Sequence, residues 1–217
     1  MRAERPSRLA QMSRRAAITG AALAAMALSA CGGNKGGSAE GDMALGAADG
    51  AKVTVVEYAS VTCGHCALWQ QNTWPAFKAK YVDTGKVRYV MKEMLTPPAE
   101  VAAAGFLIAR CAGPASYFAI LDAVFRSQAE WQTKGVRAGL MEAGAKAGLS
   151  EDQVVACAKD DAALTALDAR VERARADGIR ATPTFKVNGV LAGEGVISLA
   201  ELDKAIADAA KARPKRK

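Results

Sequence analysis

Two short apolar runs with a helical pattern between them open the patterned part of the chain. Residues 53–60 predict a largely buried strand, and residues 87–94 predict a second one, because both are rich in β-branched and aromatic positions. Residues 63–80 predict a helix between the two strands, with a kink at Pro75. This order of elements is a βαβ unit.

The segment from residue 99 to residue 177 is rich in alanine and has no strand-like run. Its apolar spacing and its Gly and Pro positions predict helices over residues 99–111, 114–129, 136–147, 151–158 and 161–176. The stripe formed by Phe118, Leu121 and Phe125 indicates a core-facing side of a helix rather than a cofactor site. Trp69, in the preceding helix, is expected nearer the surface.

A hairpin and a helix are predicted after the helical segment. Residues 182–188 and 190–192 predict two strands, which a tight Asn-Gly turn joins. A closing helix begins at Ser198, which forms a capping box with Glu201, and it ends near Ala210. No repeat and no second core is evident, so we expect one folded domain over residues 52–212.

The N-terminal part of the chain has the pattern of an export signal. Residues 1–30 hold five arginines and one glutamate, followed by an apolar stretch too short to cross a bilayer comfortably. The stretch ends at Cys31 in the pattern of a bacterial lipoprotein signal, which predicts removal of residues 1–30 and lipidation of Cys31. An ordinary secretory signal and an uncleaved anchor are the alternatives. Residues 31–51 are glycine-rich and predict a flexible tether.

The net charge of the mature chain is smaller than that of the whole sequence. The formal charge is +7, and removal of residues 1–30, which carry +4, leaves +3. Residues 211–217 alone carry +5, so the folded body between them has a net charge of about −2. The basic pI therefore does not indicate a nucleic-acid partner. Residues 213–217 are expected to be a solvated basic tail.

The sequence Cys63-Gly64-His65-Cys66 follows the first predicted strand directly and begins the predicted helix. Two intervening residues in a first helical turn bring the sulfurs within bonding reach, and the helix dipole favours a thiolate at Cys63. Lowering a thiol pKa from about 8.5 to below 7 requires roughly 2 kcal/mol, more than the dipole alone supplies. The free N–H groups of the first turn and a positive charge on His65 are the further donors available. The pattern therefore favours a redox-active dithiol over half of a metal site.

Two further cysteines, Cys111 and Cys157, remain once Cys31 is assigned to a lipid. In an oxidising compartment such a pair is reasonably interpreted as a structural disulfide. The alternative is two buried free thiols.

The combination of a βαβ unit, CxxC at the helix start, a helical insertion and Thr182-Pro183 at the opening of a hairpin resembles the thioredoxin superfamily. The helical block is similar to the DsbA-type branch of bacterial envelope thiol oxidoreductases, and the resemblance covers about residues 52–210. It implies an α/β thioredoxin fold with an inserted helical subdomain over about residues 99–177. Phrases around Cys111 and Cys157 are similar to members with an additional cysteine pair, which supports the same bridge.

The resemblance also implies roles for single residues. Cys63 would be the exposed nucleophile that forms a mixed disulfide with a client protein, and Cys66 the buried sulfur that resolves it. Pro183 would be a cis-proline facing the dithiol, and Thr182 would offer backbone hydrogen bonds to an extended client. Glu57 matches a buried acid that moves protons for the resolving cysteine, with a satisfied strand-end carboxylate as the alternative.

His65, the only histidine of the chain, is expected to tune the Cys63 thiol, with a plain surface residue as the alternative. Stabilising the thiolate stabilises the reduced form and makes the disulfide a better oxidant. The Gly-His loop is also found in eukaryotic disulfide isomerases. An isomerase of the dimeric kind needs an N-terminal dimerisation domain, which the short glycine-rich segment cannot build, so we expect a monomer.

Three functions follow from these features. The first is a lipid-anchored periplasmic oxidase that donates the Cys63–Cys66 disulfide to newly exported proteins and is reoxidised by a membrane quinone-linked partner. The second is a reductase of the same fold. The third is a metal carrier that uses Cys63, Cys66 and His65, although a closed zinc site wants four ligands and no second CxxC or other histidine is present. We expect neither a cofactor nor a resident metal.

Overall fold

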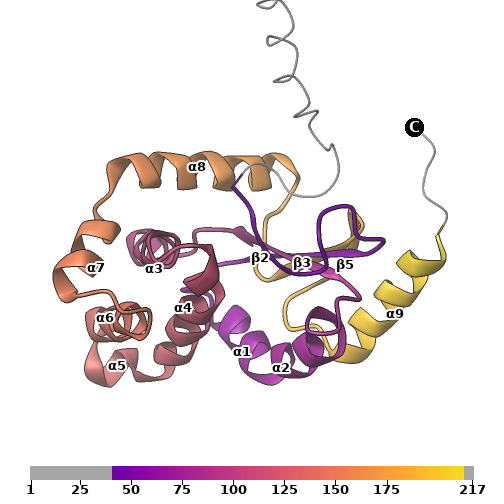
Figure 1. Cartoon of the computed structure of the whole chain (residues 1–217), viewed down its shortest axis with the longest axis horizontal. Coiled ribbons are helices and arrows are strands. Elements are labelled where there is room, and N and C mark those ends of the chain that lie inside the picture. Colours follow the sequence, from indigo (N-terminus) through magenta and orange to yellow (C-terminus); the bar gives the residue numbers. More distant parts are fainter. Residues whose placement is uncertain (1–40, 213–217) are drawn as a thin grey trace, which may run out of the picture. The chain divides into compact units, whose positions relative to one another are not determined.

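The computed structural model of the chain describes residues 41–212 (Figure 1). The predicted signal segment 1–30, the predicted lipidation site Cys31 and the basic tail 213–217 lie outside these residues. Within residues 41–212, each helix is too short or too polar to cross a membrane.

One five-stranded sheet forms the centre of the fold. Its strands are β1 (Met43–Gly46), β2 (Thr54–Ala59), β3 (Arg88–Glu93), β4 (Thr184–Val187) and β5 (Val190–Glu194). The order across the sheet is β1-β3-β2-β4-β5. Strands β2 and β3 are parallel, as the βαβ interpretation requires, and all other neighbours are antiparallel. The central position of β2 explains why its run is apolar on both faces.

Strand β1 corrects the predicted tether. Met43 lies opposite Met91 and Gly46 opposite Arg88, so part of the segment 31–51 belongs to the sheet. Gly46 has φ +83°, and a Cβ there would lie 2.4 Å from the Val87 carbonyl oxygen, so only glycine fits. The prediction of a tether through residue 51 is therefore wrong, because a four-residue strand among glycines and alanines is too short to show a period.

The helix predicted over residues 63–80 is divided in the structure. It consists of α1 (Gly64–Asn72), α2 (Trp74–Phe77) and a π-helical turn at Lys78–Val82. Pro75 lies in the first turn of α2, where its missing N–H is harmless, so the break falls just before it, at Thr73. The predicted kink is thus confirmed as a break two residues before Pro75.

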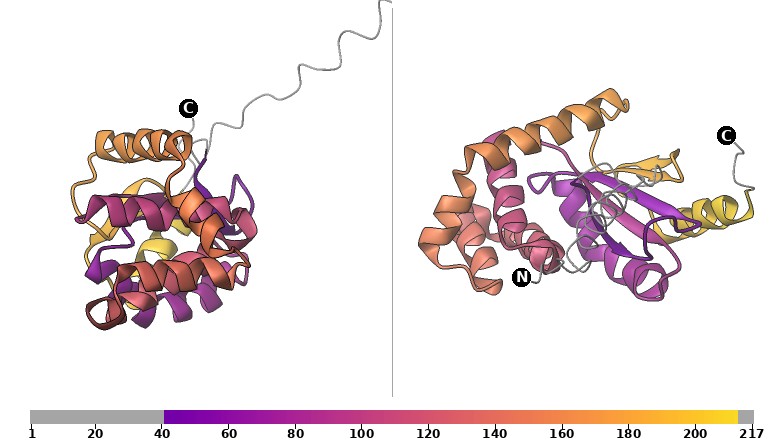
Figure 2. Two further views of the ribbon diagram at one scale, coloured as in Figure 1. Left: turned by 90° about the vertical axis from the view of Figure 1, so that its left-hand side faces the viewer. Right: turned by 45° about the horizontal axis from the view of Figure 1, so that its top comes forward.

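The inserted helices match their predicted ranges closely. They are α3 (Ala99–Cys111), α4 (Pro114–Ser127), a 3₁₀ turn (Gln128–Glu130), α5 (Trp131–Lys134), α6 (Val136–Lys146), α7 (Glu151–Ala158) and α8 (Asp161–Ala176). The chain closes with α9 (Leu199–Lys211). Helix α8 crosses one face of the sheet, where it packs on β3, while α1 and α2 lie on the other face (Figures 1 and 2).

The core on the α1 side of the sheet is aromatic. Trp69 is fully buried, and its ring lies 4.7 Å from that of Phe185 and 6.0 Å from that of Phe77. The expectation that Trp69 lies nearer the surface is wrong, because it shares the inward face of α1 with Cys66, three residues earlier. The stripe on α4 is confirmed as core-facing: Leu121 and Phe125 are buried, and Phe118 is partly buried against the core.

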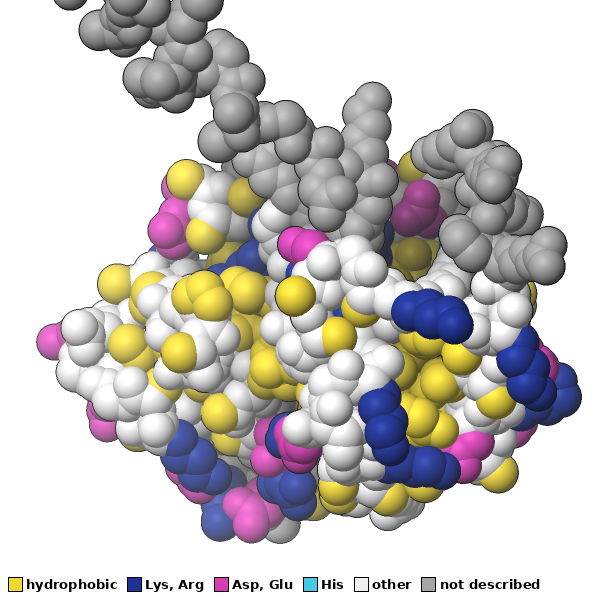
Figure 3. All heavy atoms as spheres, turned by 45° about the vertical axis from the view of Figure 1, so that its right-hand side comes forward, with side chains coloured by type: hydrophobic (Ala, Val, Ile, Leu, Met, Phe, Trp, Pro, Cys, Tyr) yellow, Lys and Arg dark blue, Asp and Glu magenta, His cyan; other side chains and the backbone are white. Residues whose placement is uncertain are grey.

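Edge strand β5 leaves apolar side chains in solvent. Val190 is 72% exposed and Leu191 is 56% exposed. Figure 3 shows a face of the molecule on which hydrophobic side chains are interspersed with Lys and Arg.

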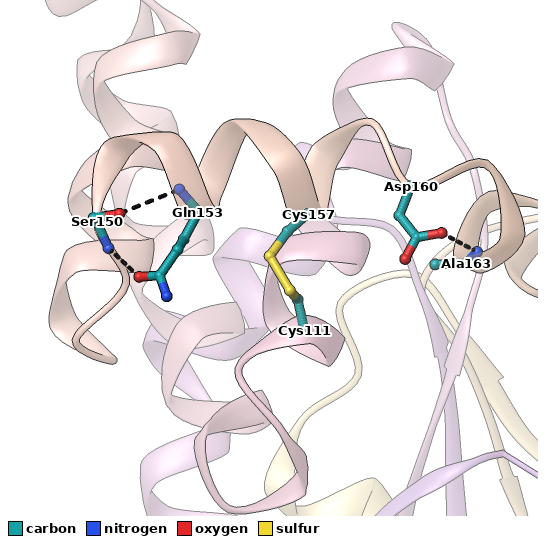
Figure 4. The surroundings of a disulfide bond; sticks show 6 residues. All are labelled: Cys111, Ser150, Gln153, Cys157, Asp160 and Ala163. Atoms are coloured by element: carbon teal, nitrogen blue, oxygen red, sulfur yellow. Dashed lines mark hydrogen bonds between the residues drawn. A yellow bond between two sulfur atoms is a disulfide. The ribbon is translucent and has the colours of Figure 1, made fainter.

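The predicted pairing of Cys111 with Cys157 is confirmed. The bond joins the end of α3 to α7, with Cα atoms 5.9 Å apart (Figure 4). Helix α7 begins at a capping box in which Ser150 and Gln153 bond each other's backbone N–H groups. The bridge therefore connects two well-defined helices of the insertion.

Replacing both bridge cysteines, Cys111→Ser/Cys157→Ser, is expected to lower the free energy of unfolding by about 4 kcal/mol, because the bridge closes a loop of 46 residues. Urea unfolding followed by circular dichroism measures the change. The matched control, Cys63→Ser/Cys66→Ser, keeps the bridge, so a similar loss in both variants would contradict this assignment.

Glu93, the last residue of β3, holds three inserted helices to the sheet. Its side chain is 1% exposed, and its Oε1 accepts hydrogen bonds from Arg110 Nε of α3 at 2.5 Å and from the Tyr117 hydroxyl of α4 at 3.0 Å. Its Oε2 accepts from Arg170 Nε of α8 at 2.6 Å. A buried carboxylate with these partners is well compensated, and sequence patterns gave no signal for it.

Candidate active site

Cys63 occupies the N-cap of α1 with extended backbone angles. Its sulfur accepts a hydrogen bond from the Cys66 backbone N–H at 3.2 Å. This is the position of an N-cap oxygen, which satisfies a free N–H of the first turn. The predicted placement of the leading thiol at the helix start is confirmed.

The loop before β4 meets this thiol. The Thr182-Pro183 peptide bond is cis, and the Cys63 thiol donates a hydrogen bond to the Thr182 carbonyl oxygen at 3.4 Å. The two segments are 119 residues apart in sequence. The structure therefore brings together the dithiol and the proline loop, as the resemblance implied.

The thiol of Cys63 is acidic. A hydrogen bond from the Cys66 side chain is the largest cause, and hydrogen bonds from the Thr182 side chain and from the backbones of Cys66 and His65 add to it. Partial burial acts in the opposite direction, and the balance lowers the pKa of Cys63 from 9.0 to about 6. Most of the thiol is therefore a thiolate at neutral pH.

Cys66 has the opposite character. Its side chain is fully buried, and burial raises its pKa strongly, as do the hydrogen bond to Cys63 and the charges of Cys63 and Glu57. The two sulfurs thus differ in access and in acidity, the division of roles expected of an attacking and a resolving cysteine.

Glu57 is a fully buried residue of the central strand β2, and its charge acts on Cys66. Its Oε2 accepts hydrogen bonds from the Tyr89 hydroxyl and from Gln70 Nε2 at 3.3 Å, while its Oε1 has no hydrogen-bond partner among the described residues. Burial raises its pKa from 4.5 to about 8; the Tyr89 hydrogen bond lowers the pKa and the nearby Cys63 charge raises it. A half-satisfied buried acid can exchange a proton near neutral pH, so proton transfer by Glu57 stays a prediction.

Glu57→Gln is expected to slow exchange through Cys66 by about 10-fold to 100-fold and to remove an inflection near pH 8 from its pH profile, because glutamine carries no transferable proton. The variant should also gain stability relative to the wild type as pH rises from about 4.5 to 8. Over that range the unfolded Glu57 ionises freely, whereas the folded one keeps its proton.

Quenched-flow kinetics of mixed-disulfide formation by the oxidised protein, the step in which Cys66 leaves, measures the first effect between pH 5 and 9, and urea unfolding at several pH values measures the second. The matched control is Glu100→Gln, at the exposed start of α3. Gln70→Glu would not serve, because Gln70 contacts Glu57. A retained inflection near pH 8 in Glu57→Gln would exclude Glu57 as its source.

His65 is exposed, and its interaction with Cys63 in the structure is a backbone hydrogen bond that contributes to the lowered pKa of the thiol. Tuning by a charge on the imidazole ring therefore stays a prediction. Any residue at position 65 other than proline would supply the backbone donor.

A polar network that sequence reasoning missed braces the loop before the dithiol. Thr62 contacts Thr96 through both hydroxyls at 2.8 Å, and Ser60 Oγ accepts from the Thr96 N–H at 3.1 Å. This network ties the CxxC loop to the end of β3. Gln70 was also missed, although its place four residues after Cys66 on the same helix face was a usable signal.

Within residues 41–212, no group of three His, Cys, Asp or Glu side chains is arranged to hold a metal ion.

Comparison with known proteins places this geometry in a family. A family model described as thioredoxin matches residues 38–208 of the chain. The chain belongs to the thioredoxin family. Its match begins before β1, which agrees with the inclusion of that strand in the sheet.

Solved structures similar to this member of the thioredoxin family include DsbA proteins. Wolbachia pipientis α-DsbA1 is 27% identical with a TM-score of 0.70, over 79% of this chain and 94% of that one. Bacillus subtilis BdbD, at 21% identity and a TM-score of 0.69 over 82% and 97% of the two chains, shows the fold alone. The chain is thus a DsbA-like thioredoxin-superfamily protein, and the predicted fold class with its helical insertion is confirmed.

Curated relatives come from Rickettsia. A candidate protein-disulfide oxidoreductase of Rickettsia bellii is 34% identical over 172 residues, which cover 77% of this chain and 65% of the relative. One from Rickettsia typhi is 36% identical over 152 residues, or 69% and 55% of the two chains. The chain therefore spans between about half and two thirds of the length of these relatives.

Proposed function

We propose that the protein is a thiol:disulfide oxidoreductase that donates the Cys63–Cys66 disulfide to exported proteins through a mixed disulfide. The contact of the Cys63 thiol with the Thr182 carbonyl oxygen, 119 residues away in sequence, carries the proposal. An acidic, partly exposed thiol then lies next to backbone that an extended client can pair with. The names of the Rickettsia relatives support the same class of reaction.

The reaction follows from the two sulfurs and the buried acid. A client thiolate attacks Cys63 Sγ, the Cys63–Cys66 bond breaks, and Cys66 leaves with the electron pair and takes a proton from the Glu57 carboxyl. A second client thiolate then attacks the client sulfur of the mixed disulfide and releases Cys63 as a thiolate. The client gains a disulfide, and the protein is left as the dithiol.

The acidity of Cys63 supports the oxidase direction. A thiolate stabilised in the dithiol form favours reduction of the protein, so its disulfide is readily transferred to clients. A low pKa also makes Cys63 a good leaving group in the second step. A reductase of the same fold is the alternative, since exchange is reversible.

Location and partners form part of the same proposal. The Cys111–Cys157 bridge supports an oxidising compartment such as the periplasm, because disulfides persist there. We infer a monomer that is anchored through a lipid on Cys31 and is reoxidised by a quinone-linked membrane protein.

Two measurements together test the direction. Equilibration of the protein with glutathione buffers should show the dithiol favoured over the disulfide at ratios that leave ordinary structural disulfides intact. Thiol trapping in cells should nevertheless recover Cys63 and Cys66 mainly as the disulfide, because an oxidase is kept recharged. Recovery mainly as the dithiol in cells would overturn the oxidase in favour of the reductase.

A further inference from the structure

A cleft of about 320 Å³ adjoins the candidate active site. Its wall includes Thr182, whose carbonyl oxygen accepts from the Cys63 thiol, and Thr96, which contacts the residue before Cys63. The apolar residues Met94 and Ile179 also line it. An extended chain that reaches Cys63 alongside Thr182 therefore passes this cleft.

Two arginines and no acidic residue line the cleft. Arg180 Nη1 donates to the carbonyl oxygens of Arg175 at 2.6 Å and of Ile179 at 2.9 Å, which fixes the guanidinium while its other nitrogens keep their donors. Among residues 41–212, no carboxylate forms an ion pair with Arg180. Arg175 pairs with the exposed Glu172 on its own helix at 2.5 Å, a contact that solvent weakens.

We propose that this cleft binds an acidic side chain of the client, so that the protein prefers segments with Asp or Glu close to the reactive cysteine. The inference rests on the proposed function and names its substrate class. Arg180 precedes Thr182 by two residues, and extended chain advances about 3.3 Å per residue. A carboxylate two or three residues from the client cysteine therefore reaches the guanidinium, whose fork matches carboxylate geometry.

Charge also distinguishes the two redox forms at this site. In the disulfide form Cys63 carries no charge, so an acidic segment is attracted by the arginines alone. Once the client disulfide has formed, Cys63 is left as a thiolate beside the same segment and repels its carboxylates. The cleft thus favours binding of reduced acidic clients and release of oxidised ones.

Three dithiol peptides that differ only in the residues flanking one cysteine, Glu, Gln or Lys, test the proposal with the full oxidised protein. Stopped-flow mixing and chromatography of the products give the second-order rate constant for each peptide. Flanking charges also change the reactivity of the peptide thiol itself. Each rate constant is therefore divided by the rate constant for the reaction of the same peptide with a neutral disulfide, 2-hydroxyethyl disulfide. We expect the corrected constant for Glu to exceed that for Lys about tenfold, and the ratio to shrink in 0.5 M salt.

Variants locate the preference. In Arg175→Gln/Arg180→Gln the Glu-to-Lys ratio should fall to nearly one, while Arg180→Lys, which keeps the charge, should retain part of it. Arg173→Gln is the matched control, because Arg173 is exposed on the same helix outside the cleft, and it should keep the full ratio.

A corrected ratio of one in the wild type, with all peptides oxidised, overturns the acidic preference and leaves the proposed function standing. A ratio that survives in the double variant also overturns the assignment to this cleft. Failure of the wild type to oxidise any peptide overturns the proposed function together with this inference.

Discussion

Cys63→Ser is expected to lower the rate of peptide oxidation by at least about 1000-fold, because a serine oxygen at this position cannot take part in disulfide exchange. Cys66→Ser, mixed as the free thiol with an oxidised client, should instead accumulate a mixed disulfide between Cys63 and the client, because Cys66 is not there to displace the client in this reverse direction. Non-reducing electrophoresis and mass spectrometry separate the two outcomes. The contrast follows from the geometry, in which Cys63 is accessible and Cys66 is fully buried.

The pH dependence of alkylation tests the same assignment without a client. Iodoacetamide should modify Cys63 of the reduced protein with a midpoint near pH 6, because only the thiolate reacts and hydrogen bonding lowers the pKa of Cys63 to about 6. Below that midpoint the rate should fall about tenfold per pH unit. Cys66 should stay unmodified in the folded protein. A midpoint near pH 9, that of an ordinary thiol, would contradict the proposed mechanism.

The site was predictable because its chemistry is local in sequence. CxxC after a strand places Cys63 at a helix N-cap, and Thr-Pro before an Asn-Gly hairpin marks the opposing loop. The long-range contact between these segments followed from the resemblance rather than from any periodicity. Periodicity did predict the inserted helices, because each is long enough to repeat its apolar face.

Features that depend on single tertiary contacts were not predictable. Strand β1 is only four residues long, and it forms a strand because it pairs with β3 rather than because of a pattern in its own residues. Trp69 is buried because α1 lies against the sheet, which the weakly amphipathic sequence of that helix does not indicate. The network around Glu93 joins residues up to 77 positions apart, so no local pattern reveals it.

Glu93→Ala is expected to lower the free energy of unfolding by about 3–5 kcal/mol. The change removes the acceptor for Arg110 and Arg170 and leaves two largely buried cations without their carboxylate. Because these arginines come from α3 and α8, the loss should loosen the insertion from the sheet. Glu93→Gln keeps the shape of the side chain but not its charge. Its free energy of unfolding should lie between those of Glu93→Ala and the wild type.

Urea unfolding of oxidised protein measures these changes, and Asp122→Ala is the matched control. Asp122 also pairs with an arginine, Arg126 at 2.9 Å, but on an exposed helix surface where such a pair contributes about 0.2–1 kcal/mol. A loss in Glu93→Ala no larger than that of the control would show that the buried network does not hold the insertion. Met94, the residue after Glu93, lines the cleft beside the dithiol. If Glu93→Ala shows the full loss of stability, we therefore expect its preference among the charged peptides to weaken before the reactivity of Cys63 changes.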